Sequence, residues 1–179
     1  MQLDTYQAKV LTFLFGKLPI GDAVETLEFS LSGKFTGKYR IAHSAIDRTE
    51  QQATIVFTLP TYSQSVFLAL TRTNVAATAR ILANLEDYER ESSMQLGLGE
   101  VVVTPEQVRG VATPHAVVLL RTATSLDCAN VPDVTTLGDR QTSFFLVIPL
   151  AKDEWELRRE RGHDALMDHF QEDEKELFF

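Results

Sequence analysis

The sequence predicts an α+β fold with a mixed, mainly antiparallel sheet flanked by helices. The six apolar residues from Phe144 to Pro149 indicate a central strand buried on both faces, because a half-exposed strand would alternate apolar and polar side chains. The predicted strands also come in runs, with helices between the runs rather than after each strand. This order favours the α+β class over a doubly wound parallel sheet.

The N-terminal region is expected to form a helix and a hairpin. Asp4 or Thr5 can cap a short helix, and Gly16 closes it. Residues 27–31 alternate apolar and polar side chains, as in a half-buried strand. Residues 32–38 contain two glycines without the Gly-Lys-Ser/Thr ending of a phosphate loop, so they are expected to be a hairpin connection.

The middle of the chain predicts a strand and a long helix. Residues 53–59 form an apolar strand that Pro60 ends, whereas residues 66–70 fit either a strand or the start of a helix. Asn74 can cap a helix that runs to Glu91. The stripe expected to be buried holds Val75, Leu82 and Leu85. The opposite face holds Arg80, Asn84, Asp87 and Glu91. It is expected to be solvated, with contact to a partner as the alternative.

Two further strands are expected at residues 100–103 and 116–120. Residues 122–140 are polar and contain Pro132 and Gly138. This segment is long enough to be a mobile or functional loop.

A charged helix is expected after the central strand, which Pro149 should end because proline has no N–H to donate. Asp153 and Glu154 stand in the first turn, where the helix dipole favours anions. Glu154 and Arg158 are spaced as an i,i+4 ion pair. Gly162 can then end this helix in a left-handed cap.

Several short motifs occur in an order typical of one known family. They are Val56 to Pro60, the stretch from Leu82 to Gly99, Ile148-Pro149-Leu150, Trp155, and Gly162-His163-Asp164-Ala165-Leu166. In this respect the chain resembles suppressor-of-fused-like domains, which are found in bacteria and in animal Hedgehog signalling. The resemblance implies a suppressor-of-fused-like α+β fold, and we expect residues 1–179 to form one such domain.

Composition restricts the class of protein. The 179 residues carry a formal net charge of −8, which argues against a nucleic-acid ligand because phosphate binding needs a basic surface. Cys128 is the only cysteine, so an intrachain disulfide is impossible and a reducing compartment is expected. No stretch approaches the roughly 20 apolar residues of a membrane span. We therefore expect a soluble cytoplasmic protein that binds neither nucleic acid nor membrane.

The sequence contains no motif for catalysis, for a cofactor or for a metal. His163 and His169 are six positions apart and point in different directions on a helix, unlike a metal-binding pair at i and i+4. Cys128 follows Asp127, and a neighbouring carboxylate disfavours the thiolate that a nucleophile needs. We therefore predict no catalytic residue, no metal ligand and no cofactor.

The expected function is a non-enzymatic protein-interaction module. The resemblance implies either an immunity protein that neutralises a toxin or a regulator that sequesters a partner protein. The alternative is a small-molecule hydrolase or transferase with a site near residues 122–140. A pocket with polar groups converging beside His115, Asp127 or Cys128 would favour the enzyme, and a flat acidic patch would favour the binder.

The partner is expected to be another protein, a basic one such as a nuclease toxin, because acid is concentrated at the C-terminal end. Trp155 either covers the edge of the sheet or contacts this partner. The other predicted partner-binding residues are Glu172, Asp173, Glu174 and Glu176. The sequence does not specify the oligomeric state.

Changing these four acidic residues to glutamine should slow association with a basic partner several-fold at low salt. At high salt the effect should vanish, because the screening length falls from about 10 Å at 0.1 M to about 3 Å at 1 M. Stopped-flow association rates at both salt concentrations, with a partner isolated by pull-down, measure this. Equal rates for mutant and wild type at low salt would contradict it.

Overall fold

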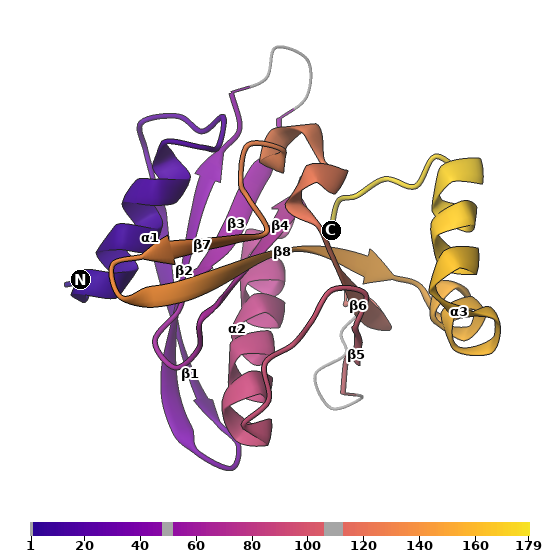
Figure 1. Cartoon of the computed structure of the whole chain (residues 1–179), viewed down its shortest axis with the longest axis horizontal. Helices are drawn as coiled ribbons and strands as arrows, with labels where there is room; N and C mark the ends of the chain where they lie inside the picture. The colour runs from indigo at the N-terminus through magenta and orange to yellow at the C-terminus, as the bar shows by residue number, and fades with distance from the viewer. Residues whose placement is uncertain (1, 48–51, 106–112) are drawn as a thin grey trace.

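The computed structural model describes residues 2–47, 52–105 and 113–179. Within these residues, eight strands form one sheet with the order β1-β2-β3-β4-β8-β6-β5, and β7 pairs with β8 beside this path (Figure 1). The strands are β1 (Glu25–Ser32), β2 (Thr36–Ala45), β3 (Thr54–Leu59), β4 (Ser65–Thr71), β5 (Val101–Val103), β6 (Ala116–Leu120), β7 (Val134–Leu137) and β8 (Arg140–Leu150). The helices are α1 (Thr5–Phe15), α2 (Val75–Ser92) and α3 (Lys152–Glu172).

The predicted α+β class with a mixed, mainly antiparallel sheet is confirmed. Strands β1 to β4 form an antiparallel meander, and β6 and β7 are antiparallel to β8. The β4–β8 pair is parallel, with Phe67 opposite Phe145. Residues 66–70, which fitted strand or helix, lie in β4.

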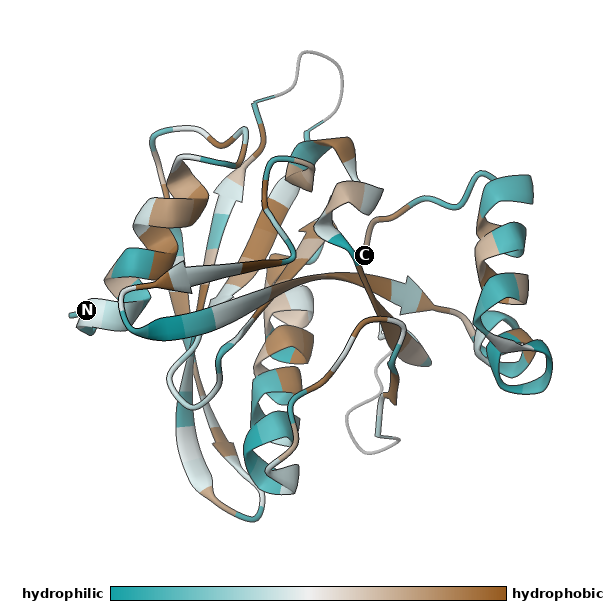
Figure 2. Ribbon diagram, in the orientation of Figure 1, coloured by the Kyte–Doolittle hydropathy of each residue, from teal (hydrophilic) through white to brown (hydrophobic). Residues whose placement is uncertain are grey.

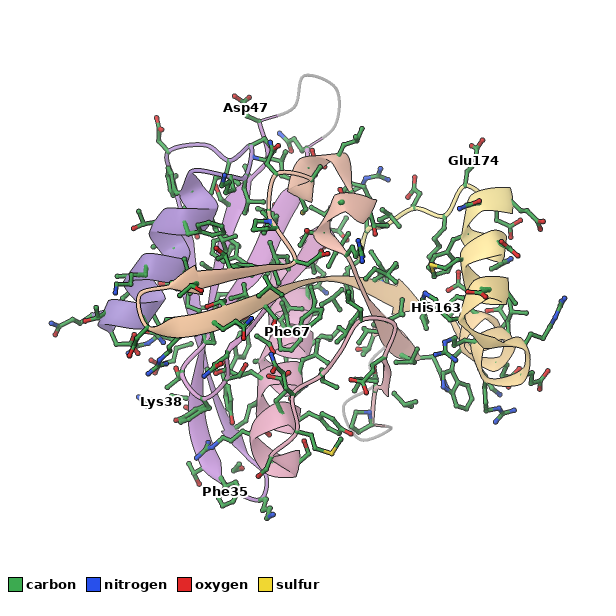
Figure 3. All side chains as sticks on the ribbon, in the orientation of Figure 1. Phe35, Lys38, Asp47, Phe67, His163 and Glu174 are labelled. Atoms are coloured by element: carbon green, nitrogen blue, oxygen red, sulfur yellow. The ribbon has the colours of Figure 1, made fainter. Side chains whose placement is uncertain are left out.

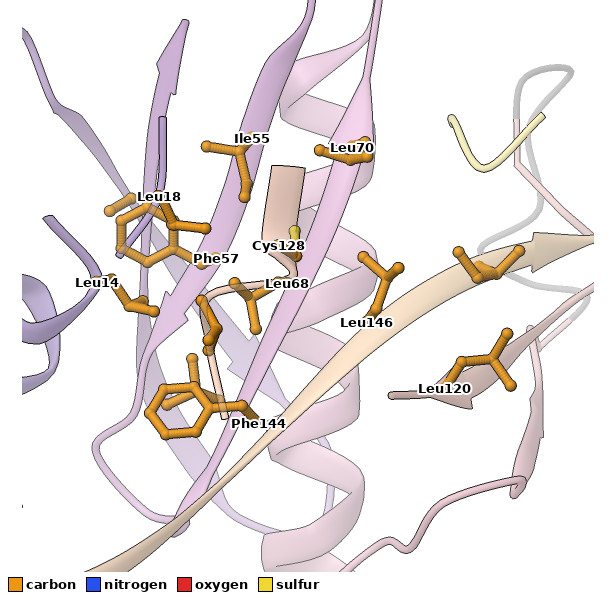
Figure 4. Packing of buried hydrophobic residues seen from close by; sticks show 14 of the residues in the cluster. Leu14, Leu18, Ile55, Phe57, Leu68, Leu70, Leu120, Cys128, Phe144 and Leu146 are labelled. Atoms are coloured by element: carbon orange, nitrogen blue, oxygen red, sulfur yellow. The ribbon is translucent and has the colours of Figure 1, made fainter. Parts of the chain in front are cut away.

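The central strand is β8, as predicted. Its side chains alternate between two core clusters, with Phe144, Leu146 and Ile148 on one face and Phe145 and Val147 on the other. The first face is covered by α1 and by part of α3, and the second by α2. Figure 2 shows apolar residues along the central part of β8 and mostly polar residues on α3. Figure 4 shows the first core cluster from close by.

Both predicted N-caps are confirmed. The Asp4 carboxylate accepts a hydrogen bond from the Gln7 N–H at 2.8 Å, and the Gln7 side chain accepts one from the Asp4 N–H. Asn74 accepts a hydrogen bond from the Ala77 N–H at 3.0 Å. These bonds satisfy N–H groups that the first turn of a helix leaves without partners.

The buried side of α2 is wider than periodicity predicted. It includes Glu86 and Glu89, which are 0 % and 6 % exposed. Asp87 and Glu91, predicted to be solvated, contact the β1–β2 hairpin instead, where Asp87 accepts a hydrogen bond from the Tyr39 hydroxyl. The reason is that the long hairpin folds over α2, which a helical pattern cannot reveal.

Two predictions about where regular secondary structure is interrupted were wrong. Residues 122–140 are not an open loop: they contain two 3₁₀ turns, at 122–124 and 126–128, and then β7. Pro149 does not end β8, but lies opposite Val117 within it. A proline is tolerated there because the described pairing of β4 with β8 stops at Leu146, so beyond it one side of β8 has no ladder partner among the described strands.

The helix after β8 breaks at Gly162, as predicted, but not in a left-handed α conformation. Gly162 has φ 92° and ψ −178°, a region that only glycine occupies readily. The predicted Glu154–Arg158 pair is replaced by an ion pair between Glu154 and Lys175, at 2.7 Å.

No helix in the described part of the chain combines the length and apolarity that crossing a membrane requires.

Replacing Gly162 with alanine should lower the free energy of unfolding by about 1–3 kcal/mol, the usual cost of a residue held in so unfavourable a conformation. An added Cβ meets no atom within 4 Å at Gly162 or at Gly21, whose backbone is ordinary. Gly21→Ala is therefore the matched control and should leave stability nearly unchanged. Urea unfolding of both variants tests this, and equal stabilities would contradict it.

Candidate partner-binding groove

A groove of about 800 Å³ lies at the β5 end of the sheet, between α2 and the first turns of α3. Its walls come from the outer face of α2, from β5 with the residues beside it, and from α3. The lining residues are Ile81, Asn84, Leu85, Asp87, Tyr88, Glu91, Leu96, Glu100, Val101, Val102, Val103, Thr104, Pro105, Val117, Trp155, Arg158 and Arg159.

The free edge of β5 lies in this groove. Next to β5 in the ladder with β6, the Leu119 N–H donates to the Glu100 carbonyl and the Thr104 N–H donates to the His115 carbonyl, each at 3.0 Å. Because antiparallel pairing alternates, the N–H and C=O groups of Val101 and Val103 point away from β6. No strand among the described residues pairs with that outer side.

The side chains of β5 alternate between the two walls. Val102 packs against the core cluster beneath α2, and Val101 against the cluster that includes part of α3. Val103 is 41 % exposed, and Tyr88 on the α2 wall is 47 % exposed. The groove thus presents apolar and aromatic surface on both sides of a strand edge that no described strand pairs with.

Trp155, predicted to cover a sheet edge or to contact a partner, forms part of the α3 wall. Its ring lies 4.7 Å from the His115 ring, and the Arg159 guanidinium lies 4.9 Å over it. Trp155 is half-buried and packs against the core, so it covers the edge and still lines the groove.

Charges in the groove are divided between its walls. Asp87 and Glu91 lie on the α2 side and Glu100 beside β5, whereas Arg158 and Arg159 lie on α3. A bound segment would therefore meet acidic groups along one side and basic groups along the other.

Two buried carboxylates hold α2 in place beside the groove. Glu86 accepts hydrogen bonds from the N–H groups of Thr61 and Tyr62, both at 2.7 Å. Glu89 accepts from the Leu96 N–H at 2.7 Å, which secures the chain as it leaves α2 for β5. Sequence reasoning missed Glu86 because a glutamate in a helix ordinarily signals solvent.

Burial raises the pKa of Glu86 to about 7, although the N–H groups of Tyr62 and Thr61 favour its charged form and act in the opposite direction. Glu89 lies nearby and adds to the increase by charge repulsion. The fold therefore holds a proton on Glu86 more tightly than an unfolded chain does.

The four predicted acidic residues at the C-terminal end lie outside the groove lining. All four are exposed, but Asp173 pairs with His169 at 3.3 Å and Glu176 with Arg72 at 3.0 Å. The backbone beyond them docks on the sheet, where the Phe179 N–H donates to the Leu70 carbonyl at 2.8 Å. The structure therefore does not gather these carboxylates with Trp155 into one site.

Residues 124 and 136–140 of the segment considered for an enzyme site line clefts, but the residues named for its chemistry do not. Cys128 is fully buried in the core cluster of Figure 4, and Asp127 is 8 % exposed. None of four clefts in the described part of the chain has His115, Asp127 or Cys128 in its lining. Nor do three His, Cys, Asp or Glu side chains meet as a metal-binding group anywhere in the described residues.

The fold is that of suppressor-of-fused-like domains. The chain superimposes on the crystal structure of a protein described as a SUFU (suppressor of fused protein) homologue from Neisseria gonorrhoeae, with a TM-score of 0.67 and 13 % identity, over 97 % of this chain and 93 % of that one. The likeness establishes the fold that the short sequence motifs implied.

Two further structures match less closely. They are the Sufu–Fu complex (TM-score 0.49, 7 % identity, 89 % of this chain and 72 % of that one) and Drosophila Suppressor of Fused (TM-score 0.47, 11 % identity, 89 % and 40 %). The sequence matches no family model and no curated protein.

Replacing Glu86 with glutamine should remove a pH dependence of stability. Because the pKa of Glu86 in the fold is about 7 against an ordinary 4.5, its contribution is complete below pH 4.5 and is lost as the pH rises through 7. The loss amounts to about 3 kcal/mol. Urea unfolding of wild type and Glu86→Gln between about pH 4 and about pH 8 measures it.

Glu160→Gln, which changes an exposed carboxylate on α3, is the charge control. Its free energy of unfolding should follow the wild-type pH profile. A Glu86→Gln profile parallel to that of the wild type would show that Glu86 does not hold the extra proton.

Proposed function

We propose that this chain is a non-enzymatic protein-interaction module that binds an extended segment of a partner protein along β5. The observation that carries the proposal is the outer edge of β5, which has no partner strand among the described residues and lies in a groove between two helices. An extended peptide can add to such an edge through main-chain hydrogen bonds, while pockets for alternate side chains supply specificity.

The geometry of β5 determines how the peptide would lie. The outward N–H and C=O groups of Val101 and Val103 would form the main-chain hydrogen bonds. Successive side chains of the peptide would then point alternately to the α2 wall, near Leu85 and Tyr88, and to the α3 wall, near Trp155. Tyr and Trp are the residue types most often found at energetically important positions of interfaces.

The proposed partner segment is apolar with basic side chains on the α2 side. There it would meet Asp87 and Glu91, with Glu100 beside β5. The net charge of −8 would also speed the approach of a basic protein. Neutralisation of a basic toxin by an immunity protein and sequestration of a basic regulator both fit this chemistry, and identification of the partner distinguishes them.

A peptide is first selected from a random displayed library for binding to the wild-type protein. This peptide should bind less tightly to Val103→Glu than to the wild type, because the substitution places a charge at the exposed strand edge. Leu126→Glu is the matched control, because Leu126 is 90 % exposed and lies outside the groove. We expect the control to bind as the wild type does. Equal affinities for all three proteins would place the binding site elsewhere.

Hydrogen exchange on the same complex tests the binding mode. The amides of Val101 and Val103 should exchange more slowly when the peptide is bound, because only then do they donate to a strand. The Val102 amide already faces β6, so its exchange should change little. Protection of Val102 alone, or of none of the three, would argue against strand addition.

A further inference from the structure

A second cleft, of about 580 Å³, lies between α3 and the end of β6. Its walls are apolar where Leu98, Leu120 and Met167 line it, but Arg158 and His163 also reach it. Three basic side chains (Arg121, Arg158 and His163) line this cleft against one acidic residue, Glu100, although the whole protein carries a net charge of −8.

The break in α3 brings Arg158 and His163 to the same cleft. In a regular helix, side chains five positions apart are about 140° apart around the axis and so do not share a face. The extended conformation of Gly162 interrupts the helix directly before His163. Figure 3 shows His163 on the side of α3 that faces the sheet.

Both side chains have hydrogen-bonding capacity that the described protein atoms do not use. One Nη of Arg158 donates to the Gly99 carbonyl at 3.4 Å, but its Nε is buried without an acceptor. Nδ1 of His163 is likewise buried without a partner. Leaving buried polar nitrogen atoms unbonded is costly, and an anion that accepted their hydrogen bonds would remove that cost.

The one acidic residue in the lining of this cleft already accepts a hydrogen bond. Oε2 of Glu100 accepts the Gly97 N–H at 2.6 Å, which fixes the turn before β5. Gly99 has φ 78°, and a Cβ there would stand 3.6 Å from the His163 ring, so the turn lies directly against the imidazole. Arg121 at the rim is largely exposed and lies 3.6 Å from Asp133.

We propose that this cleft binds the carboxylate of a small apolar acid, held by Arg158 and His163. A guanidinium matches the geometry of a carboxylate, and its hydrogen bonds to an anion are among the stronger ones in proteins. The apolar walls at Leu98, Leu120 and Met167 then accommodate the rest of the ligand. The inference does not depend on peptide binding along β5, although Arg158 and Glu100 line both clefts.

Butyrate is the probe, and 1-butanol and inorganic phosphate are the comparators. The ¹⁵N signals of the His163 imidazole and of Arg158 Nε are followed by NMR at fixed pH and ionic strength. Butyrate should shift both signals to saturation, whereas butanol should not, because it lacks the charge. Phosphate should bind more weakly, because it lacks an apolar tail. No saturable shift with butyrate, or equal binding of phosphate, would overturn the proposal.

Arg158→Met should weaken butyrate binding about tenfold or more, the loss expected for a hydrogen-bonded charge. Arg161→Met is the matched control: it removes the same charge from the same helix, but Arg161 is exposed and does not line the cleft. Equal weakening by both variants would indicate a general charge effect and overturn the assignment. If Arg158→Met does not fold, the wild-type titration still decides.

The same experiment distinguishes two sources of the carboxylate, an acidic residue of the partner protein and a free organic acid. Addition of a peptide that binds along β5 and displaces butyrate would assign the carboxylate to an acidic residue of the partner. A peptide that binds without displacing butyrate would assign it to a free organic acid. Failure of strand addition at β5 would leave the butyrate titration unaffected, so the two proposals can fail separately.

Discussion

The burial of β8 on both faces is the constraint on which the rest of the structure depends. This strand pairs with β4, β6 and β7 and so joins the N-terminal meander to the remainder of the sheet. Phe145 and Val147 complete one core while Phe144 and Leu146 complete the other. A single strand therefore holds helices on opposite faces, and the position of every other element follows from it.

The departure of β8 from β4 creates the candidate site. Pairing between the two strands stops at Leu146, and from there β8 continues with β6 alone. The chain end docks at Leu70 on the side that β8 has left. On the other side β6 supports the short strand β5, whose outer edge has no described partner. The chain end thus covers one side of the sheet, whereas no described strand covers the other.

Two local departures from ordinary sequence rules lie beside the proposed binding surfaces. Glu86 is a fully buried carboxyl group that holds α2 to the turn between β3 and β4, and burial raises its pKa to about 7. Gly162 interrupts α3 and directs Arg158 and His163 into one cleft. Stable proteins depart from local rules mainly where geometry or function demands it.

The sequence by itself determined the elements whose causes are local. The apolar run of β8, the caps at Asp4 and Asn74 and the break at Gly162 depend on neighbouring residues, and the short family-like motifs implied the right fold. Only the tertiary structure decided the site. Of its residues, sequence reasoning had named Trp155 and, as the alternative for the polar face of the long helix, Asn84, Asp87 and Glu91. Whether the edge of β5 is free, or Glu86 is buried, depends on which distant strands and helices meet, and no local pattern records those pairings.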